Sequence, residues 1–205
     1  EYATVDHALI IKHSKEDGKI RLTFPVGLAT EEAEREILEL EIRYFRLIGQ
    51  EPRLEQIDPA MWEKLERWYP GRFQIEWMRD NADYIYERER LVSLAGKKLH
   101  GKRNHIKRFQ DQNPGWSYES LRDDNIEACI DMAREWCRRN CCIEDEEKEE
   151  EFHLVIKALK NYKALHMKGG LLRNETGVVA FTLGSPINPD TFDVCFEKAV
   201  SEIQG

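Results

Sequence analysis

The order of strand-like and helix-like patterns is the sequence feature that most constrains the fold of this chain. Residues 1–88 read as strand, strand, helix, strand, helix, strand. The expected elements are strands over 3–13 and 19–26, a helix between Thr30 and Gly49, a strand over 53–57, a helix over 60–69, and a strand or bent pair of strands over 73–86 with a turn at Asp80-Asn81. Helices must cover a sheet of this kind, which predicts a mixed α/β (α+β) layer structure.

A second set of elements follows from residue 89 onward. The expected elements are helices over 90–110, 123–140 and 146–166, then strands over 171–173, 178–184 and 192–200. Met167 to Gly170 marks the change from helices to strands. We therefore expect two domains, residues 1–88 and residues 89–205. The chain starts in one strand-like pattern and stops just after another, so we also expect a fragment with an incomplete second domain.

Charge and cysteine content narrow the functional classes. The net charge of −8 argues against general binding of duplex nucleic acid, which is typical of basic domains. The five cysteines are an odd number and lie mostly in one helical region, so they indicate a reducing, cytoplasmic environment and no disulfide framework. They lack the paired knuckles of structural zinc sites, and we expect no metal. No apolar run approaches the roughly 18 residues of a membrane span.

One basic segment, residues 96–109, stands out on this acidic chain, with six cations and no acid. At about 100° per residue, Ala95, Leu99, Ile106 and Phe109 share one helix side, and Lys102 falls inside this apolar stripe. Lys102 either lies along its apolar neighbours, pairs with a carboxylate, or contacts an anionic ligand. The candidate anion contacts are Lys98, Lys102, Arg103, Lys107 and Arg108.

The last strand-like stretch supplies two more candidates. Glu197 is a candidate general base or orienting group, and Lys198 is a candidate anion contact. In an α/β acyl-transfer fold, a phosphate-bearing donor binds where a strand leads through a glycine turn into a helix N-terminus. The alternative is that Glu197 and Lys198 form only a cross-strand ion pair.

Several spaced motifs resemble a bacterial family of unknown-function proteins related to the C-terminal domain of phosphatidylglycerol lysyltransferase. They are Asp83-Tyr84-Ile85-Tyr86, Leu94-x-Gly96-Lys97-Lys98-x-His100-x-Lys102-Arg103-Asn104-His105-Ile106-x-Arg108-Phe109, Lys168-Gly169-Gly170, Val179-Ala180-Phe181-Thr182-x-Gly184, Phe196-Glu197-Lys198-Ala199 and Glu202-Ile203-Gln204-Gly205. The likeness covers most of the chain.

This resemblance implies two tandem acyl-CoA N-acyltransferase-like domains with mixed sheets, the first lacking its first helix and the second truncated. It implies an aminoacyl-tRNA or acyl-CoA donor and an acceptor such as an anionic lipid headgroup. The basic segment would then meet tRNA or lipid phosphate, where cations give salt-sensitive affinity. That role also fits a peripheral contact with a membrane surface.

Two functions remain open at this point. The first is an enzyme that transfers an acyl or aminoacyl group to an amine or hydroxyl, with Lys102, Arg103 and Lys107 as anion contacts and Glu197 as base or orienter. Positioning and oxyanion stabilisation would provide most of its rate. The second is a non-catalytic binding module of the same fold that holds RNA or another anionic ligand. A purely structural alternative has the cations pairing with the acidic surface.

Overall fold

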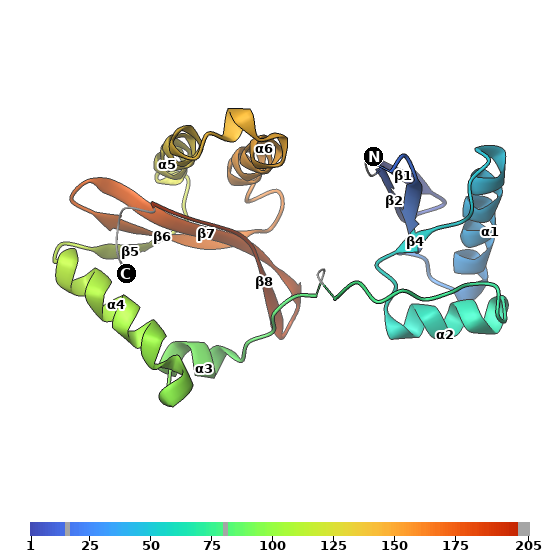
Figure 1. The fold of residues 1–205 in the computed structure, drawn as a ribbon, viewed down its shortest axis with the longest axis horizontal. Coiled ribbons are helices and arrows are strands. Elements are labelled where there is room, and N and C mark those ends of the chain that lie inside the picture. The colour runs from blue at the N-terminus through green and yellow to red at the C-terminus, as the bar shows by residue number, and fades with distance from the viewer. Residues whose placement is uncertain (15–16, 80–81, 201–205) are drawn as a thin grey trace. The chain divides into compact units, whose positions relative to one another are not determined.

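The computed structural model describes residues 1–14, 17–79 and 82–200. The chain divides into two compact units, Glu1–Asp83 and Tyr84–Gly205 (Figure 1). Each unit carries one four-stranded sheet, and the described residues form six α-helices in all. The predicted mixed α/β (α+β) architecture is therefore confirmed.

The first sheet has the strand order β1-β2-β3-β4. Its strands are β1 (Tyr2–Val5), β2 (Ala8–Ser14), β3 (Ile20–Thr23) and β4 (Leu54–Glu55). The first three strands are antiparallel, and β4 is parallel to β3. The parallel pair is possible because a helix crosses over between β3 and β4.

Two capped helices complete the first unit, α1 (Glu31–Leu47) and α2 (Pro59–Trp68). The Thr30 hydroxyl accepts a hydrogen bond from the Ala33 amide at 3.2 Å, and the Asp58 carboxylate accepts one from the Met61 amide at 2.7 Å. Such caps satisfy amides that the first helical turn leaves unpaired. Phe24, Leu38 and Leu65 form the buried centre of this unit.

Two expectations for the first unit are corrected. The single strand expected over 3–13 is a hairpin, because Asp6 and His7 take left-handed φ angles of 47° and 73° and reverse the chain. The described residues of 73–86 contain no strand, and the expected turn at Asp80-Asn81 lies outside the described residues. Apolar alternation alone does not make a strand where no partner strand is available.

The second sheet is antiparallel throughout, with the order β5-β6-β7-β8. Its strands are β5 (Ser117–Ser120), β6 (Lys168–Asn174), β7 (Gly177–Asn188) and β8 (Thr191–Ala199). Sequence analysis missed β5, whose four residues are mostly polar and show no apolar alternation. Pairing with β6 decides its conformation.

Four helices flank this second sheet: α3 (Arg88–Ser93), α4 (His100–Gln112), α5 (Ile126–Arg139) and α6 (Glu146–Lys160). The helix expected over 90–110 is broken, because Leu94 and Gly96 have φ angles of 44° and 90°. The helix expected to reach residue 166 ends at Lys160. Helices α5 and α6 cover one sheet face, and α3 and α4 lie on the other (Figure 1).

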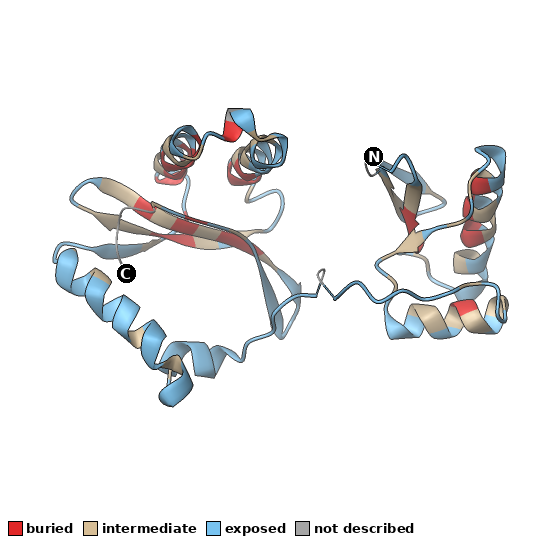
Figure 2. Cartoon of the chain, viewed as in Figure 1, coloured by how far each residue is buried: buried red, intermediate tan, exposed pale blue. Residues whose placement is uncertain are grey.

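The core of the second unit lies between the sheet and the α5–α6 layer. Ile130 and Leu159 of the helices and Leu183 of β7 have no exposed surface. Figure 2 shows buried residues on the sheet and on the facing sides of α5 and α6, whereas α4 is mostly exposed. The α4 side of the sheet is therefore the more open side.

Candidate functional site

A groove of about 720 Å³ lies between the α3–α4 segment and the second sheet. We call it the α4 groove. Its lining is mainly apolar and consists of Leu91, Leu94, Lys102, His105, Ile106, Phe109, Gln110, Trp116, Leu172, Val179, Ala180, Ala199 and Val200. A volume of this size is typical of sites for small organic ligands.

The sheet wall of the α4 groove comes from neighbouring strands. Leu172 of β6 pairs with Ala180 of β7, which pairs with Ala199 of β8. Directly opposed residues of an antiparallel sheet project from the same face. The two alanine side chains are short, so this part of the sheet leaves space beneath α4.

The helix wall follows a regular spacing. Lys102, His105, Ile106 and Phe109 stand at positions i, i+3, i+4 and i+7, which share one side of a helix. All four line the groove. Lys102 thus shares the apolar side of α4, as the sequence pattern predicts.

Helix α4 is attached to the sheet through its C-terminal end. The Phe109 and Trp116 rings meet edge to face, with centroids 5.9 Å apart. The Asn174 side-chain amide of β6 donates a hydrogen bond to the Asn113 side-chain carbonyl at 2.8 Å. No residue of α4 is buried. This one-ended attachment keeps the groove open beside Lys102.

The structure gives the five predicted cations of the basic segment different surroundings. Lys102 lines the groove. Arg103 donates to the carbonyl oxygens of Leu94 and, at 3.0 Å, Gly96, so it holds the turn between α3 and α4. Lys107 pairs with Asp111 at 3.0 Å.

The other two cations of this set, Lys98 and Arg108, are exposed. Neither makes a hydrogen bond or ion pair with the described part of the chain. Lys98, Lys102 and Arg108 therefore remain the candidates for contact with an external anion.

Glu197 and Lys198 project from opposite faces of β8. The Lys198 side chain is 8% exposed, and its Nζ lies 2.7 Å from a Glu151 carboxylate oxygen of α6 and 4.0 Å from the ring centroid of Trp136 of α5. Lys198 thus belongs to the layer between β8 and the α5–α6 pair, and its ion pair is with Glu151, not Glu197. Glu197 is exposed and shares a strand face with Ala199, on the groove side.

Lys198→Ala is expected to lower the free energy of unfolding of the second unit by about 2 kcal/mol, because it removes an ion pair, a cation–π contact and a buried aliphatic stem. Urea unfolding of the full chain measures the change. Lys168→Ala is the matched control, since Lys168 is exposed on β6, and it should stay within about 0.5 kcal/mol of the parent. Equal effects of the two substitutions would show that the Lys198 contacts contribute nothing.

His105 and Gln110 are groove residues that sequence analysis did not select. The available signal was the three-residue spacing from Lys102 to His105, which puts both on one helix side. Trp116 could be recognised only from tertiary structure, because it reaches the groove through its contact with Phe109.

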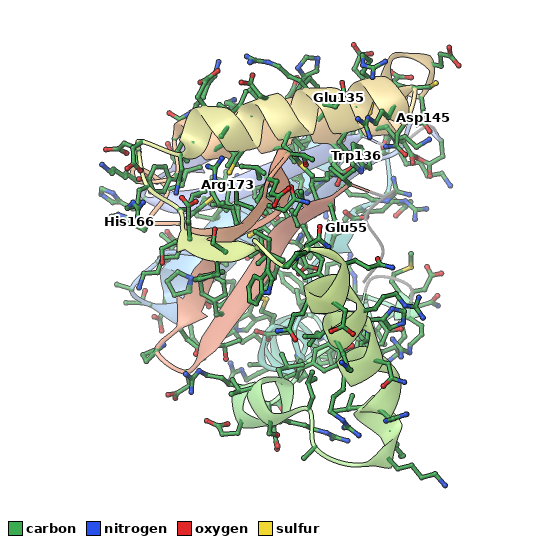
Figure 3. All side chains as sticks on the ribbon, turned by 90° about the vertical axis from the view of Figure 1, so that its left-hand side faces the viewer. Glu55, Glu135, Trp136, Asp145, His166 and Arg173 are labelled. Atoms are coloured by element: carbon green, nitrogen blue, oxygen red, sulfur yellow. The ribbon has the colours of Figure 1, made fainter. Side chains whose placement is uncertain are left out.

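A second cavity of about 720 Å³ lies between α5 and the β6–β7 hairpin, and its charged lining residues are already paired within the chain. Glu135 accepts hydrogen bonds from Arg138 and Arg139, and these guanidinium groups lower its pKa to about 2. Arg173 donates to Glu119 at 2.8 Å, which lowers the pKa of that carboxyl. Figure 3 labels Glu135 and Arg173. We therefore consider the α4 groove the better candidate site.

Comparison with known proteins gives a matching family and several similar solved structures, among them the two that follow. The family described as "Phosphatidylglycerol lysyltransferase, C-terminal" matches residues 1–205. A conserved protein of unknown function from Bacteroides thetaiotaomicron is 35% identical, with a TM-score of 0.83 over 98% of this chain and 67% of that chain. Among curated proteins, no sequence matches.

The second solved structure is the C-terminal domain of an Agrobacterium fabrum protein described as a lysylphosphatidylglycerol synthetase. It is 12% identical, with a TM-score of 0.58 over 98% of this chain and 60% of that chain. At this identity the likeness concerns the fold alone. Among the helices of the described ranges, none combines the length and apolar character that a membrane span requires.

Proposed function

We propose that this chain, which belongs to the phosphatidylglycerol lysyltransferase C-terminal family, transfers an acyl or aminoacyl group to an amine or hydroxyl acceptor. Family membership supports a transferase-like role. The proposed donor is an aminoacyl-tRNA or acyl-CoA, and the proposed acceptor is an amphiphile with an anionic headgroup, such as a lipid. The observation that carries this choice is the α4 groove, in which apolar walls meet the cation Lys102.

The walls of the groove favour an amphiphilic ligand. Ile106, Phe109 and Leu172 would take up apolar chain, since burial of apolar surface contributes about 25 cal/mol per Å². Lys102 would meet the phosphate, because a charge-assisted hydrogen bond contributes about 1.5–3 kcal/mol. Lys98 and Arg108 are exposed and would add long-range attraction for a polyanion such as tRNA.

The chemistry of such a transfer requires little covalent participation by the protein. A neutral amine or hydroxyl attacks the carbonyl carbon of an ester or thioester, the bond from that carbon to the leaving oxygen or sulfur breaks, and the leaving group takes up a proton. Holding the two reactants together provides most of the acceleration. Glu197 is our candidate for the group that accepts or orients the acceptor's proton, since it projects on the groove side of β8.

Lys102→Ala is expected to weaken binding of dioctanoyl phosphatidylglycerol by at least about tenfold, because the phosphate loses its charged partner. Isothermal titration calorimetry with the full chain measures the affinity. Lys97→Ala removes the same charge from an exposed residue outside the groove and should change the affinity less than about twofold.

Dioctanoyl phosphatidylcholine is the matched control ligand, because it has the same acyl chains as the phosphatidylglycerol and no net charge. Equal affinity for the two lipids, or equal losses in the Lys102 and Lys97 variants, would contradict an anion site at Lys102. Mass spectrometry of mixtures with aminoacyl-tRNA or acyl-CoA then tests for a transferred group on the lipid.

The second candidate function is a binding module that holds the same ligand without transfer. One observation favours it: among the described residues, no carboxylate lines the α4 groove, and Lys102 and His105 are its titratable side chains. Binding of dioctanoyl phosphatidylglycerol that depends on Lys102, with no acylated product in the mass spectra, would favour this function.

A further inference from the structure

Glu41 of α1 is a buried carboxyl group without a partner. The residue is 3% exposed, and neither of its two carboxyl oxygens has a hydrogen-bond partner in the described part of the chain. Burying a carboxyl group without compensating hydrogen bonds is strongly unfavourable, and native structures contain few such groups. Its presence in the middle of a core-facing helix therefore calls for an explanation beyond packing.

Glu41 also lines a cavity of about 350 Å³ between the first sheet and α1. Ile10 and Leu22 contribute the sheet wall, and Ile37 and Leu40 contribute the helix wall. This volume is at the small end of the range for ligand sites. The cavity thus combines a short apolar chamber with one acid, Glu41, that has no partner.

The other charged groups of this cavity are already engaged. Lys12 forms an ion pair with Glu1, and both line the cavity. Tyr2 and Tyr44 are the remaining titratable side chains of the lining. No ion pair joins Lys12 to Glu41 in the described structure. A counter-ion for the ionised form of Glu41 would therefore come from outside these residues.

We propose that this cavity binds a small organic cation, an ammonium group on a short aliphatic body, with Glu41 as its counter-ion. The ammonium supplies hydrogen-bond donors and a positive charge to the two unpartnered oxygens. The aliphatic body fills the space between Leu22, Ile37 and Leu40. Because both oxygens are shielded from solvent, we expect the Glu41 side chain to turn toward the cavity when the cation binds.

Binding of this kind is coupled to a proton. Burial raises the pKa of Glu41 to about 8, so the carboxyl is largely protonated at neutral pH. A bound ammonium favours the ionised carboxylate, and its binding therefore releases a proton below that pKa. Affinity should rise with pH between 6 and 8 by up to about tenfold per pH unit.

The test is isothermal titration calorimetry of the full chain with n-butylammonium chloride at pH 6.5, in two buffers of different ionisation enthalpy. We expect saturable binding of one equivalent with release of most of one proton. Glu41→Gln keeps the shape of the side chain and removes the charge, so it should weaken binding at least tenfold and abolish proton release. Glu36→Gln, on an exposed position of the same helix, should leave both unchanged.

The probe n-butanol separates charge from apolar burial, because it has the same aliphatic body without the cation. Equal affinity for n-butanol and n-butylammonium would overturn the proposal. So would an unchanged affinity in Glu41→Gln, or no saturable binding of n-butylammonium at millimolar concentration in a parent chain that circular dichroism shows to be folded. Because the α4 groove has no part in this test, loss of the transfer function leaves its outcome unaffected.

Discussion

Replacing Glu41 by leucine is expected to raise the free energy of unfolding of the first unit by about 3–5 kcal/mol at pH 9 and by much less at pH 4. The pKa of Glu41 is about 8 in the folded chain, against an ordinary value of 4.5. Burial is the cause, because a low-dielectric surrounding disfavours the charged form. The folded chain therefore holds this proton more tightly than the unfolded chain does.

The sign of the pH dependence follows from that difference. Below pH 4.5 both states are protonated, and Glu41 carries no ionic penalty. Between pH 4.5 and 8 the unfolded chain loses the proton and gains stability relative to the folded chain, so folding becomes less favourable as the pH rises. Above pH 8 the penalty is constant. Leucine removes it, and the advantage of Glu41→Leu should grow across this window.

Urea titrations at several pH values measure this change, and hydrogen exchange of peptides from α1 assigns the transition to the first unit. Glu36→Leu is the control, because Glu36 is exposed on the same helix. A gain from Glu41→Leu that does not vary between pH 4 and 9 would contradict the buried-acid explanation. Retention of such a destabilising residue is typical of functional sites, where stability is lower than the fold alone would allow.

Gly169→Ala is expected to destabilise the second unit by about 3 kcal/mol, the upper part of the usual range for overpacking. A Cβ atom at Gly169 would lie 2.1 Å from the Thr182 carbonyl oxygen and 3.2 Å from the Leu183 Cα. These are backbone atoms of the paired strand β7, so relief requires β6 and β7 to separate. Hydrogen exchange of β6 and β7 peptides in the full chain measures the loss.

Gly101→Ala provides the matched control for this substitution. Apart from the adjoining backbone of α4 itself, no heavy atom would lie within 4 Å of a Cβ at Gly101. Alanine there should stabilise the helix by up to about 1 kcal/mol. Protection of β6 and β7 that is equal in Gly169→Ala and in the parent chain would show that the strands do not approach as closely as the structure describes.

Local sequence signals predicted much of the fold. Thr30 and Asp58 begin helices because their side chains accept hydrogen bonds from amides three residues further along, which is a purely local geometry. The stripe that contains Lys102 and Phe109 follows from the helical period alone. The strand β5 and the break at Leu94 escaped prediction, because pairing with β6 and a left-handed backbone angle are not encoded in apolar periodicity.

The candidate site, like the fold, was predicted only in part from the sequence. The basic segment and the place of Lys102 in its apolar stripe could be found by reading the chain, but the partners of the five cations could not. Tertiary structure places Lys102 at the α4 groove, gives Arg103 and Lys107 partners within the chain, and turns Lys198 toward Glu151. The value of a charged side chain depends on which groups surround it, and these come from distant parts of the sequence.

The sequence by itself determined the family, most of the order of strands and helices, and the apolar side of the cationic helix, because these depend on residue types at short, regular spacings. Only the tertiary structure decided that Glu41 is a buried acid without a partner and that α4 stands over the open face of a sheet. The physical reason is that burial and charge pairing are set by contacts between residues far apart in the chain. The period of a helix or a strand carries no information about them.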